Sequence, residues 1–318
     1  MILSRTVTVH FFLLIFAVPA GSLVAQFIPG DEQHDIDFLR PRIFAGYTTT
    51  STRSFEDIAG TYKMTSFSLG ATVPFYDDVV RSDEGTDARF AIASGRFSSL
   101  LPQISFLATR HTLYAATLGA SAGLFTNSKN LYMLTLNAGI AEDDNTIQNP
   151  QLRLTGSGLG TERFGDSFRL LFGLSYSYTF DRGLLLPILG ADWKFAEEWR
   201  LRLLLPFLFE VQFEDMSSLQ FGFLVRANGN RFRFEDDNYS AGSSNAEYLR
   251  ISQLQAAFRV SLRIVDNLWV YGEAGVLRNR NLGIWAGENN LVSSRIENSG
   301  YSSMILRYTI GKSRSWTD

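Results

Sequence analysis

The feature that most constrains this chain is a long stretch, residues 167–213, in which apolar side chains recur at every second position. From Phe168 to Phe180 the even positions are all Phe, Leu or Tyr, and from Trp199 to Phe213 the odd positions are all apolar. A period of two indicates β-strands, and strict alternation indicates that the two faces of the sheet meet different surroundings. Because one face is rich in aromatic residues and the other carries arginines, the pattern favours a sheet whose apolar face contacts lipid.

The first 25 residues have the pattern of a secretory signal. Arg5 lies in a short basic region, residues 11–18 form an apolar core, and small residues precede a cleavage point ahead of Gln26. The uncharged run of residues 11–25 is shorter than the roughly 20 apolar residues of a membrane-spanning helix. We therefore expect a signal peptide in residues 1–25, an irregular N-terminal segment in residues 26–41, and an outer-membrane β-barrel in residues 42–318.

Composition excludes several classes of protein. The 318-residue chain has no cysteine, so it forms no disulfide, thiolate metal site or lipidated N-terminal cysteine. A net charge of −3 without a basic block argues against a nucleic-acid partner. If the mature chain spans a membrane, it must do so as a closed barrel, because backbone groups in lipid need partners within the protein.

Alternation along the rest of the chain predicts twelve strands, an even number as in bacterial single-chain barrels. The predicted strands cover about residues 42–52, 61–73, a strand from 88, 112–125, 132–140, 168–180, 184–194, 199–213, 218–234, 254–264, 268–282 and 303–310. Two further strands within residues 98–110 would make fourteen. A parity change near Gly229 favours a β-bulge there, and Pro187 and Pro206 inside strands also indicate bulges.

The lengths of the connections predict the orientation. The short turns at 126–130, 181–183, 214–217 and 265–267 are expected at the end that holds both termini, and the long segments 142–165, 235–247 and 283–299 at the outer end, with 196–198 as a short exception. A soluble β-sandwich or an interior-packed barrel would show the same alternation. The signal and the loop asymmetry favour an all-β, transmembrane antiparallel up-and-down β-barrel, in which Phe172, Leu203 and Phe258 face outward. Its expected partners are outer-membrane lipids and the barrel-assembly machinery, and the pattern implies no particular oligomeric state.

The inward positions of the best-patterned strands carry an excess of basic side chains. They are Arg169, Lys194, Arg200, Arg202, Arg226, Arg259, Arg263 and Arg307, opposed by Asp192, Glu210 and Glu273. A ring of such residues in a lumen favours anions. Alternatively, the same charges pair with one another and stabilise a narrow, filled interior, since barrel diameter grows with strand number.

Other motifs offer little chemistry. His34 and His111 are the only histidines after the signal, and neither lies in a recognisable catalytic pattern, so we expect no enzyme, no catalytic residue and no cofactor. The glycine-rich run 156–160 lacks the helix and lysine of a phosphate loop and is expected to be an outer loop. The acidic clusters 142–144 and 235–237 are expected on outer loops, either solvated or binding divalent cations together with lipid phosphates.

Residues 185–213, with Pro187 to Gly190, Trp193, Trp199 and Leu205-Pro206, resemble a family of bacterial outer-membrane β-barrel proteins known only as a domain of unknown function. Gly272 to Gly275 before Arg278 and Arg280 adds to the resemblance. It implies fold and location over residues 26–318 and no activity. One departure is the C-terminus, where Trp316 is followed by Thr317 and Asp318 and not by the terminal aromatic residue usual in such barrels.

Together these observations predict a structural barrel or narrow passive pore with an arginine-rich lumen. The alternatives are a transporter of apolar small molecules, plugged by residues 26–41, and a surface hydrolase that depends on His111.

Overall fold

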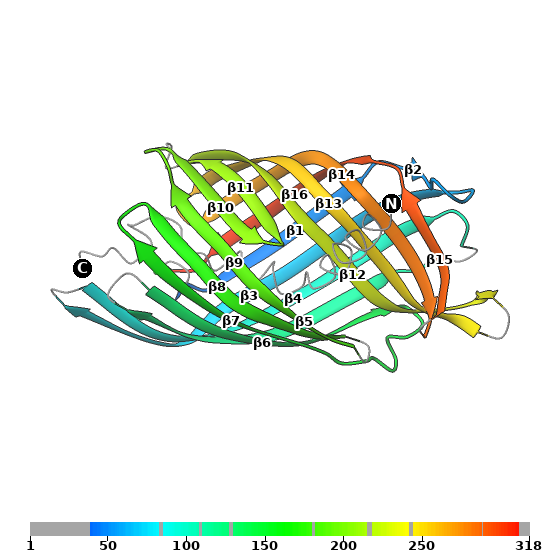
Figure 1. Ribbon diagram of the computed structural model, residues 1–318, viewed down its shortest axis with the longest axis horizontal. Coiled ribbons are helices and arrows are strands. Elements are labelled where there is room, and N and C mark those ends of the chain that lie inside the picture. Colours follow the sequence, from blue (N-terminus) through cyan, green and yellow to red (C-terminus); the bar gives the residue numbers. More distant parts are fainter. Residues whose placement is uncertain are drawn as a thin grey trace, which may run out of the picture.

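The computed structural model describes residues 39–82, 85–107, 110–126, 130–179, 182–214, 218–241, 244–287 and 289–311. The expected signal, most of the N-terminal segment and residues 316–318 lie outside this part of the chain. The described residues form a closed antiparallel barrel of 14 strands (Figure 1). Its strands are β1 (Arg42–Thr50), β3 (Thr61–Ser82), β4 (Gly85–Ile104), β5 (Leu113–Thr126), β6 (Asn130–Asp143), β7 (Arg153–Phe164), β8 (Phe168–Thr179), β9 (Arg182–Lys194), β10 (Trp199–Leu205), β11 (Leu208–Phe213), β12 (Leu219–Ala241), β13 (Ser244–Val265), β14 (Leu268–Ala286) and β16 (Ser299–Thr309). In the described part of the chain no helix is long and apolar enough to cross a membrane.

The first and last strands close the barrel. β1 pairs with β16, with Arg42 opposite Thr309, and also with β3, with Arg42 opposite Thr72. Two short strands, β2 (Arg53–Ser54) and β15 (Asn289–Ile296), extend the sheet beside β3 and β14. Because β1 is bonded on both sides, the seam of the barrel has no free edge.

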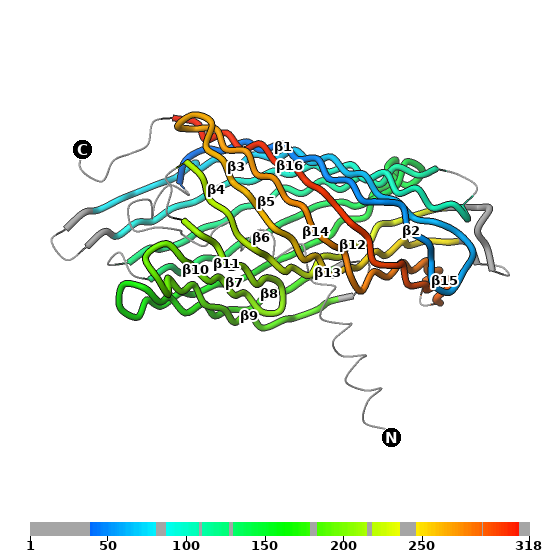
Figure 2. The backbone as a smooth tube through the Cα atoms, turned by 90° about the horizontal axis from the view of Figure 1, so that it is seen from above, coloured from blue at the N-terminus to red at the C-terminus, as the bar shows by residue number. Residues whose placement is uncertain are grey.

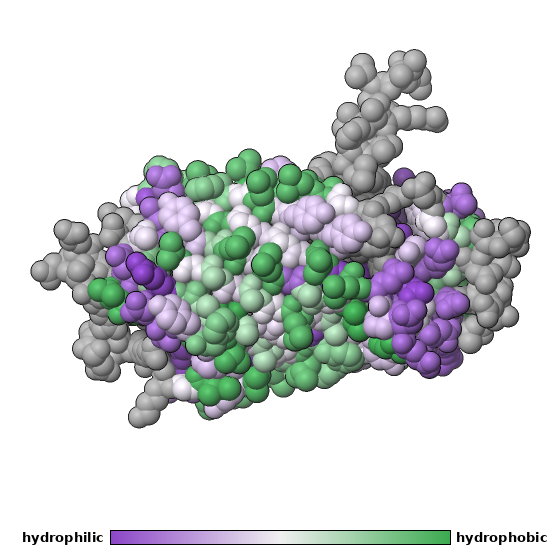
Figure 3. All heavy atoms as spheres, turned by 90° about the horizontal axis from the view of Figure 1, so that it is seen from below, coloured by the Kyte–Doolittle hydropathy of each residue, from purple (hydrophilic) through white to green (hydrophobic). Residues whose placement is uncertain are grey.

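The apolar set of side chains faces outward. Phe172 is 39% exposed and Phe258 is 53% exposed, while Leu203 is half-buried. On the other face, Thr135 and Gln255 are buried in the interior. On the side of the molecule shown in Figure 3, hydrophobic side chains form a broad belt across the middle, and hydrophilic residues gather toward the two ends. The prediction of a transmembrane up-and-down β-barrel is confirmed.

The strand count is fourteen, the alternative to the expected twelve, but the two additional strands do not lie within residues 98–110, where β4 continues to Ile104. One is β7, in the segment predicted as a long loop. The other arises because residues 199–213 are a hairpin and not a single strand: β10 and β11 pair with Trp199 opposite Phe213 and Leu203 opposite Phe209. The other segments predicted as long loops are also largely strand, since β12, β13, β14 and β15 extend into them.

The two ends of the barrel differ in their connections. At the end where β1 begins and β16 stops, here called the terminal end, no connection exceeds five residues. The longer segments, after β1, β4, β6 and β14, lie at the opposite, distal end, near β2 and β15 in Figures 1 and 2. The additional strand β7 reverses the expected direction of β8 and β9. The turn at 195–198 therefore joins the other short turns, and the turn after β8 lies at the distal end, contrary to the prediction.

At the distal end of the barrel the apolar side chains face the interior, which is the reverse of their arrangement in the lipid-facing belt. Phe232 and Phe234 on β12 are fully buried inside and alternate with the partly exposed Arg231 and Arg233. The register of β12 against β13 runs unbroken through Gly229, so the predicted bulge there is wrong; the parity changes because the interior becomes apolar. The residues of this distal core are Phe55, Tyr62, Met64, Leu100, Ile104, Leu113, Ala141, Phe232, Phe234, Ala246, Leu249, Ile251, Leu282, Ile284 and Ile296. Burial in it raises the pKa of Tyr62 to about 12.

The two prolines are also accommodated without bulges. Pro187 lies in an unbroken register opposite Leu174 of β8. Pro206 lies in the turn of the β10–β11 hairpin, after a cis peptide bond, where the Phe207 N–H donates to the Leu204 carbonyl over 2.6 Å. A cis proline at the third position of a tight turn is a defined turn type.

Candidate functional site: two faces of the barrel lumen

One face of the lumen carries a continuous chain of ion pairs from β9 to β14. Arg200 lies 2.8 Å from Asp192 and 3.0 Å from Glu214, and Arg202 lies 3.3 Å from Glu214 and 3.7 Å from Glu210. The chain continues through Arg259, which is 2.6 Å from Glu210 and 2.8 Å from Glu273, and ends with Arg226, 2.8 Å from Glu273. We call these eight residues the ionic face. Inward positions on adjacent strands bring them together.

The ionic face is balanced in charge. Its four arginines are matched by four carboxylates, one of which, Glu214, lies just beyond β11 and was not anticipated. Neutral side chains extend the network: Gln212 accepts from Arg202, Gln255 accepts from Arg226, and the Tyr301 hydroxyl donates to Glu273. Glu214 continues the even-numbered inward parity of its strand, which is the signal that would have identified it.

The remaining predicted lumen residues, Arg169, Lys194, Arg263 and Arg307, lie around the ionic face. Arg169 is buried on β8 in register with Asp192, and Lys194 is exposed near the terminal end. The guanidinium of Arg307 lies 4.9 Å from the centre of the Tyr271 ring, and that of Arg263 lies 5.9 Å from the Trp269 ring. The predicted set thus supplies seven of the eight residues of the ionic face and four further basic residues on β8, β9, β13 and β16.

The other face of the lumen is apolar. Its residues, which we call the apolar stripe, are Ala88, Phe90, Ile92, Phe125, Leu131, Met133, Leu159, Leu171, Leu186, Ile188, Leu204 and Phe207, joined at the terminal end by Leu39. They follow neighbouring rows of paired residues across β4 to β10, in which Phe125 is opposite Leu131 and Met133 is opposite Leu159. Because strands are tilted in a barrel, such a row climbs the inner wall. The stripe therefore runs from the terminal end to the tip of the β10–β11 hairpin.

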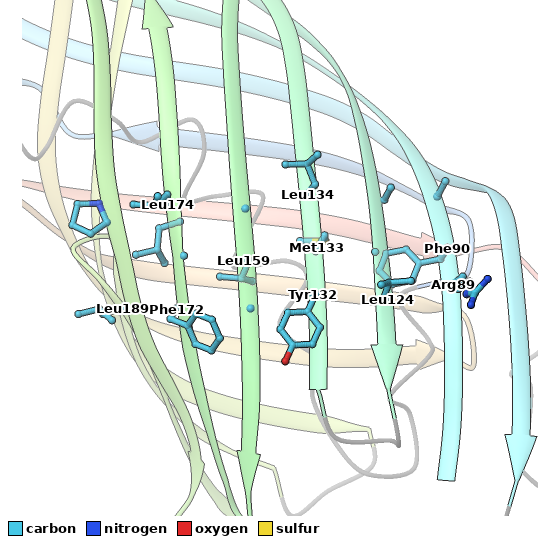
Figure 4. Close-up of a pocket in the computed structure, with 18 of the residues that line it drawn as sticks. Arg89, Phe90, Leu124, Tyr132, Met133, Leu134, Leu159, Phe172, Leu174 and Leu189 are labelled. Atoms are coloured by element: carbon cyan, nitrogen blue, oxygen red, sulfur yellow. The ribbon is translucent and has the colours of Figure 1, made fainter. Parts of the chain in front are cut away.

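The outer wall over the same strands is grooved. The groove has a volume of about 1080 Å³ and is lined by outward residues of β6, β8 and β9, among them Leu134, Phe172 and Leu189 (Figure 4). Its floor includes Gly158 and Gly160 of β7, the run expected to be an outer loop. Three outward positions of β7 in succession are glycine, and so the wall is thin there.

A cluster of polar residues, here called the latch, joins β6 to β12 at the distal end of the barrel; it consists of His111, Asp143, Thr146 and Glu235. His111 Nδ1 lies 3.2 Å from Asp143, which also accepts hydrogen bonds from the N–H and hydroxyl of Thr146 and from the N–H of Glu235 on β12. Burial alone would raise the pKa of Asp143, but the hydrogen bonds from His111, Thr146 and Glu235 outweigh it and hold that pKa below its usual value. Glu142 and Asp143 are fully buried, so the expectation of solvated loop charge is wrong for these two residues.

The latch contains the residue types of a cation site, but the hydrogen bonds among them indicate a structural role. Ligand atoms of His111, Asp143 and Asp144 lie within 4.8 Å of one another. A hard cation such as Ca²⁺ requires six to eight oxygens, whereas both oxygens of Asp143 already accept hydrogen bonds that join β6, its loop and β12. These contacts fasten the distal half of β12 against β6. His34, the other histidine, lies outside the described residues.

Several solved barrels are similar to this chain in outline. The transport unit of the autotransporter AIDA-I from Escherichia coli is 12% identical, with 85% of this chain and 89% of that chain covered and a TM-score of 0.38. The COG4313 outer membrane channel from Pseudomonas putida F1 is 7% identical, with coverage of 89% and 99% and a TM-score of 0.43. The translocator domain of NalP from Neisseria meningitidis is 9% identical, with coverage of 91% and 93% and a TM-score of 0.37. No curated protein matches the chain.

The family assignment is firmer, because a family model matches almost the whole barrel. The match covers residues 23–308 and includes both segments, 185–213 and 272–280, in which the sequence resembled an uncharacterised barrel family. That resemblance is confirmed, and this protein belongs to the family described as Domain of unknown function (DUF6268).

Proposed function

We propose that this protein is an outer-membrane channel for apolar small molecules and that its lumen does not conduct ions. The observation that carries the proposal is the division of the lumen, in which the ionic face neutralises itself and the opposite face is lined by the buried side chains of the apolar stripe. The sequence alone favoured a narrow pore with an arginine-rich interior. The function proposed here corresponds instead to its alternative, a transporter of apolar small molecules.

Paired charges argue against an anion path. Selectivity from a ring of arginines requires cationic groups that a passing ion can approach. Here each guanidinium of the ionic face lies between 2.6 and 3.7 Å from a carboxylate, and Arg259 is held between two of them. An entering anion would have to displace a partner that is fixed at contact distance.

The apolar stripe supplies affinity for an uncharged solute. Each CH₂ group that leaves water contributes about 0.8 kcal/mol, so even a small hydrocarbon gains several kcal/mol along such a surface. A row of similar side chains offers many equivalent positions and no deep minimum, which suits passage. The orientation of the barrel supports the location, since short turns and both termini lie at the periplasmic end of outer-membrane barrels.

The proposal is tested by comparing two fluxes. Purified protein in planar bilayers is expected to give no steady current, whereas bacteria that express it are expected to take up the apolar dye N-phenylnaphthylamine faster than cells without it. Leu159→Asn places an amide in the apolar stripe and should slow uptake several-fold. Ser157→Asn is the matched control, because Ser157 is two residues away on the same strand and also buried on the inner face, but outside the stripe.

A steady anion-selective current from the folded wild-type barrel would restore the pore interpretation. Dye uptake that is the same with and without the protein would remove the transport role. Folding of each variant is checked by its heat-modifiable migration on gels, so that a loss of uptake is not confused with loss of the barrel.

A further inference from the structure

The groove on the outer wall follows two rows of outward residues that cross the strands from β4 to β9. Residues opposite one another on neighbouring strands form the first row, which consists of Arg89, Leu124, Tyr132, Gly160, Phe172 and Leu189. The second row lies two residues farther toward the distal end and runs from Ala91 to Pro187. Figure 4 shows Arg89 and Leu189 at opposite ends of the first row.

Glycine makes the hollow between these rows. Gly158 of β7 is opposite Leu134 of β6 on one side and Leu174 of β8 on the other, and both leucines are exposed. A Cβ added at Gly158 would meet nothing within 4 Å. A hydrocarbon chain can therefore lie against the backbone of β7 between the flanking leucines, where more of its surface is in contact than on a flat wall.

The two ends of the groove differ in polarity. The Leu189 end is apolar, whereas Arg89 is the one charged residue among the described residues that line the groove. Asp78 of β3 lies directly opposite Arg89 in the sheet, and both side chains are exposed. The tyrosines Tyr76 and Tyr132 also line this end and carry hydroxyl groups there. The polar end thus presents one positive and one negative group side by side.

The groove spans about the depth of one membrane leaflet. The row crosses five strand spacings of about 4.8 Å, and at a strand tilt of 35–45° it changes depth by about 15 Å, roughly half of the hydrocarbon core. Trp193, outward and exposed near the terminal end of β9, marks the membrane interface four residues from Leu189. Leu189 is therefore within the hydrocarbon. Arg89, at the lower end of the row, is at the level of the headgroups on the terminal side.

We propose that the groove binds one phospholipid of the periplasmic leaflet that has a phosphoethanolamine headgroup. The lipid phosphate accepts hydrogen bonds from Arg89, the ammonium group contacts Asp78, and one acyl chain lies over Gly160 and Gly158 toward Leu189. Charge complementarity identifies this headgroup. A glycerol headgroup leaves Asp78 without a cation, and a choline headgroup has no N–H to donate to it.

A second copy of the barrel is a poorer occupant, because its convex wall would bridge the hollow and not fill it. The inference goes beyond the proposed function, since it concerns the outer wall and does not depend on what passes through the lumen.

The first test measures how many lipids stay bound. Protein in detergent micelles receives equal amounts of dipalmitoyl phosphatidylethanolamine, phosphatidylcholine and phosphatidylglycerol, and native mass spectrometry counts the lipids that remain. The wild type should retain one phosphatidylethanolamine, and Gly158→Leu, which fills the groove, should lower this retention several-fold. Gly272→Leu is the matched control, because Gly272 faces outward on β14, away from the groove, and an added Cβ there also meets nothing within 4 Å. Equal retention by all three proteins overturns the site.

The second test reads the headgroup. Arg89→Gln should lower retention of phosphatidylethanolamine and phosphatidylglycerol alike, whereas Asp78→Asn should remove only the preference for phosphatidylethanolamine. Glycerophosphoethanolamine, which has the headgroup without acyl chains, should not displace the lipid. A preference that survives both substitutions, or displacement by the chainless headgroup, overturns the proposal. A lipid-free dimer of the wild type that dissociates in Gly158→Leu also overturns it and assigns the groove to a second copy.

Discussion

At the scale of single residues, each charged side chain of the ionic face lies within ion-pair distance of at least one opposite charge. Glu273 is the clearest case, because it is buried and holds both Arg226 and Arg259. A buried ion pair gains little over apolar packing, but removal of one partner leaves an uncompensated charge. The ionic face therefore makes each member depend on the others.

Glu273→Gln is expected to destabilise the barrel by about 3–5 kcal/mol, because two guanidinium groups lose their shared carboxylate. The excess positive charge should also give a small anion-preferring current where the wild type gives none. Urea unfolding in detergent and planar-bilayer recording measure the two effects. Adding Arg226→Gln restores the charge balance and should remove the current; a current that persists in the double variant would show that it does not arise from unpaired charge.

Glycines in the wall set how closely adjacent strands approach. A Cβ added at Gly173 would lie 2.2 Å from the Gly158 carbonyl oxygen, whereas one added at Gly158 would meet nothing within 4 Å. Because the obstacle at Gly173 is backbone, Gly173→Ala should cost roughly 1–3 kcal/mol by overpacking. Gly158→Ala, on the neighbouring strand, is the control and should change the urea midpoint little. Equal effects would mean that the strands separate freely there.

At the scale of elements, period-two alternation gives the faces of a strand but not its length or its turns. The β10–β11 hairpin was missed because Trp199 pairs with Phe213 and Leu203 with Phe209, so residues of equal parity share a face on both arms. When a turn keeps odd-numbered residues on the same face in both arms of a hairpin, the alternation of apolar residues continues through the turn. The turn is then not visible in the sequence pattern. β7 was missed for another reason, since glycine occupies three outward positions and the segment reads as a loop.

Alternation also does not say which face is inside. On β12 the outward Phe223 and the inward Phe234 belong to the same strand, and the change of parity between them marks the passage from lipid belt to distal core. The lumen residues could be predicted as inward from parity alone. Their pairing could not, because it depends on which strands are neighbours and in what register.

The exchange of faces on β12 predicts unequal effects of two similar substitutions. Phe234→Ala, in the fully buried distal core, should cost about 3–5 kcal/mol through lost burial and a cavity. Phe223→Ala, at a position 46% exposed toward lipid, should cost much less, because no enclosed cavity forms. Thermal unfolding followed by gel migration in detergent compares them. A larger loss for Phe223→Ala would place the core on the wrong face.

At the scale of the whole molecule, the barrel has two parts that differ in which side of the wall is apolar. The belt is apolar outside and carries the ionic face on one side of its interior, whereas the distal part has the apolar interior of a soluble protein. The latch at Asp143 joins β6 to β12 where the intervening strands stop short. The distal end is thus closed by tertiary contacts and not by the continuous sheet.

Closure by the latch should depend on pH. The folded pKa of Asp143 lies below its usual value of 3.8, so its contribution to stability is present above that value and is lost as pH falls through the lower, folded pKa. We expect the Glu235 amide, which donates to Asp143, to lose protection from hydrogen exchange in that acidic range. Asp143→Asn should show reduced protection already at neutral pH. Protection that is unchanged by this substitution would assign the closure to the apolar core alone.

Because both arms of the β10–β11 hairpin keep one parity, this part of the sheet can change in height without turning any side chain over. Two residues added to each arm would raise the rim by about 7 Å and leave every outward and inward position as it was. Adding an odd number of residues to each arm would reverse the inward and outward faces, so that leucines and arginines would exchange places, and this would not be tolerated. The height of the sheet at the hairpin is therefore adjustable in discrete steps, and we expect homologous barrels to differ there by even numbers of residues per arm.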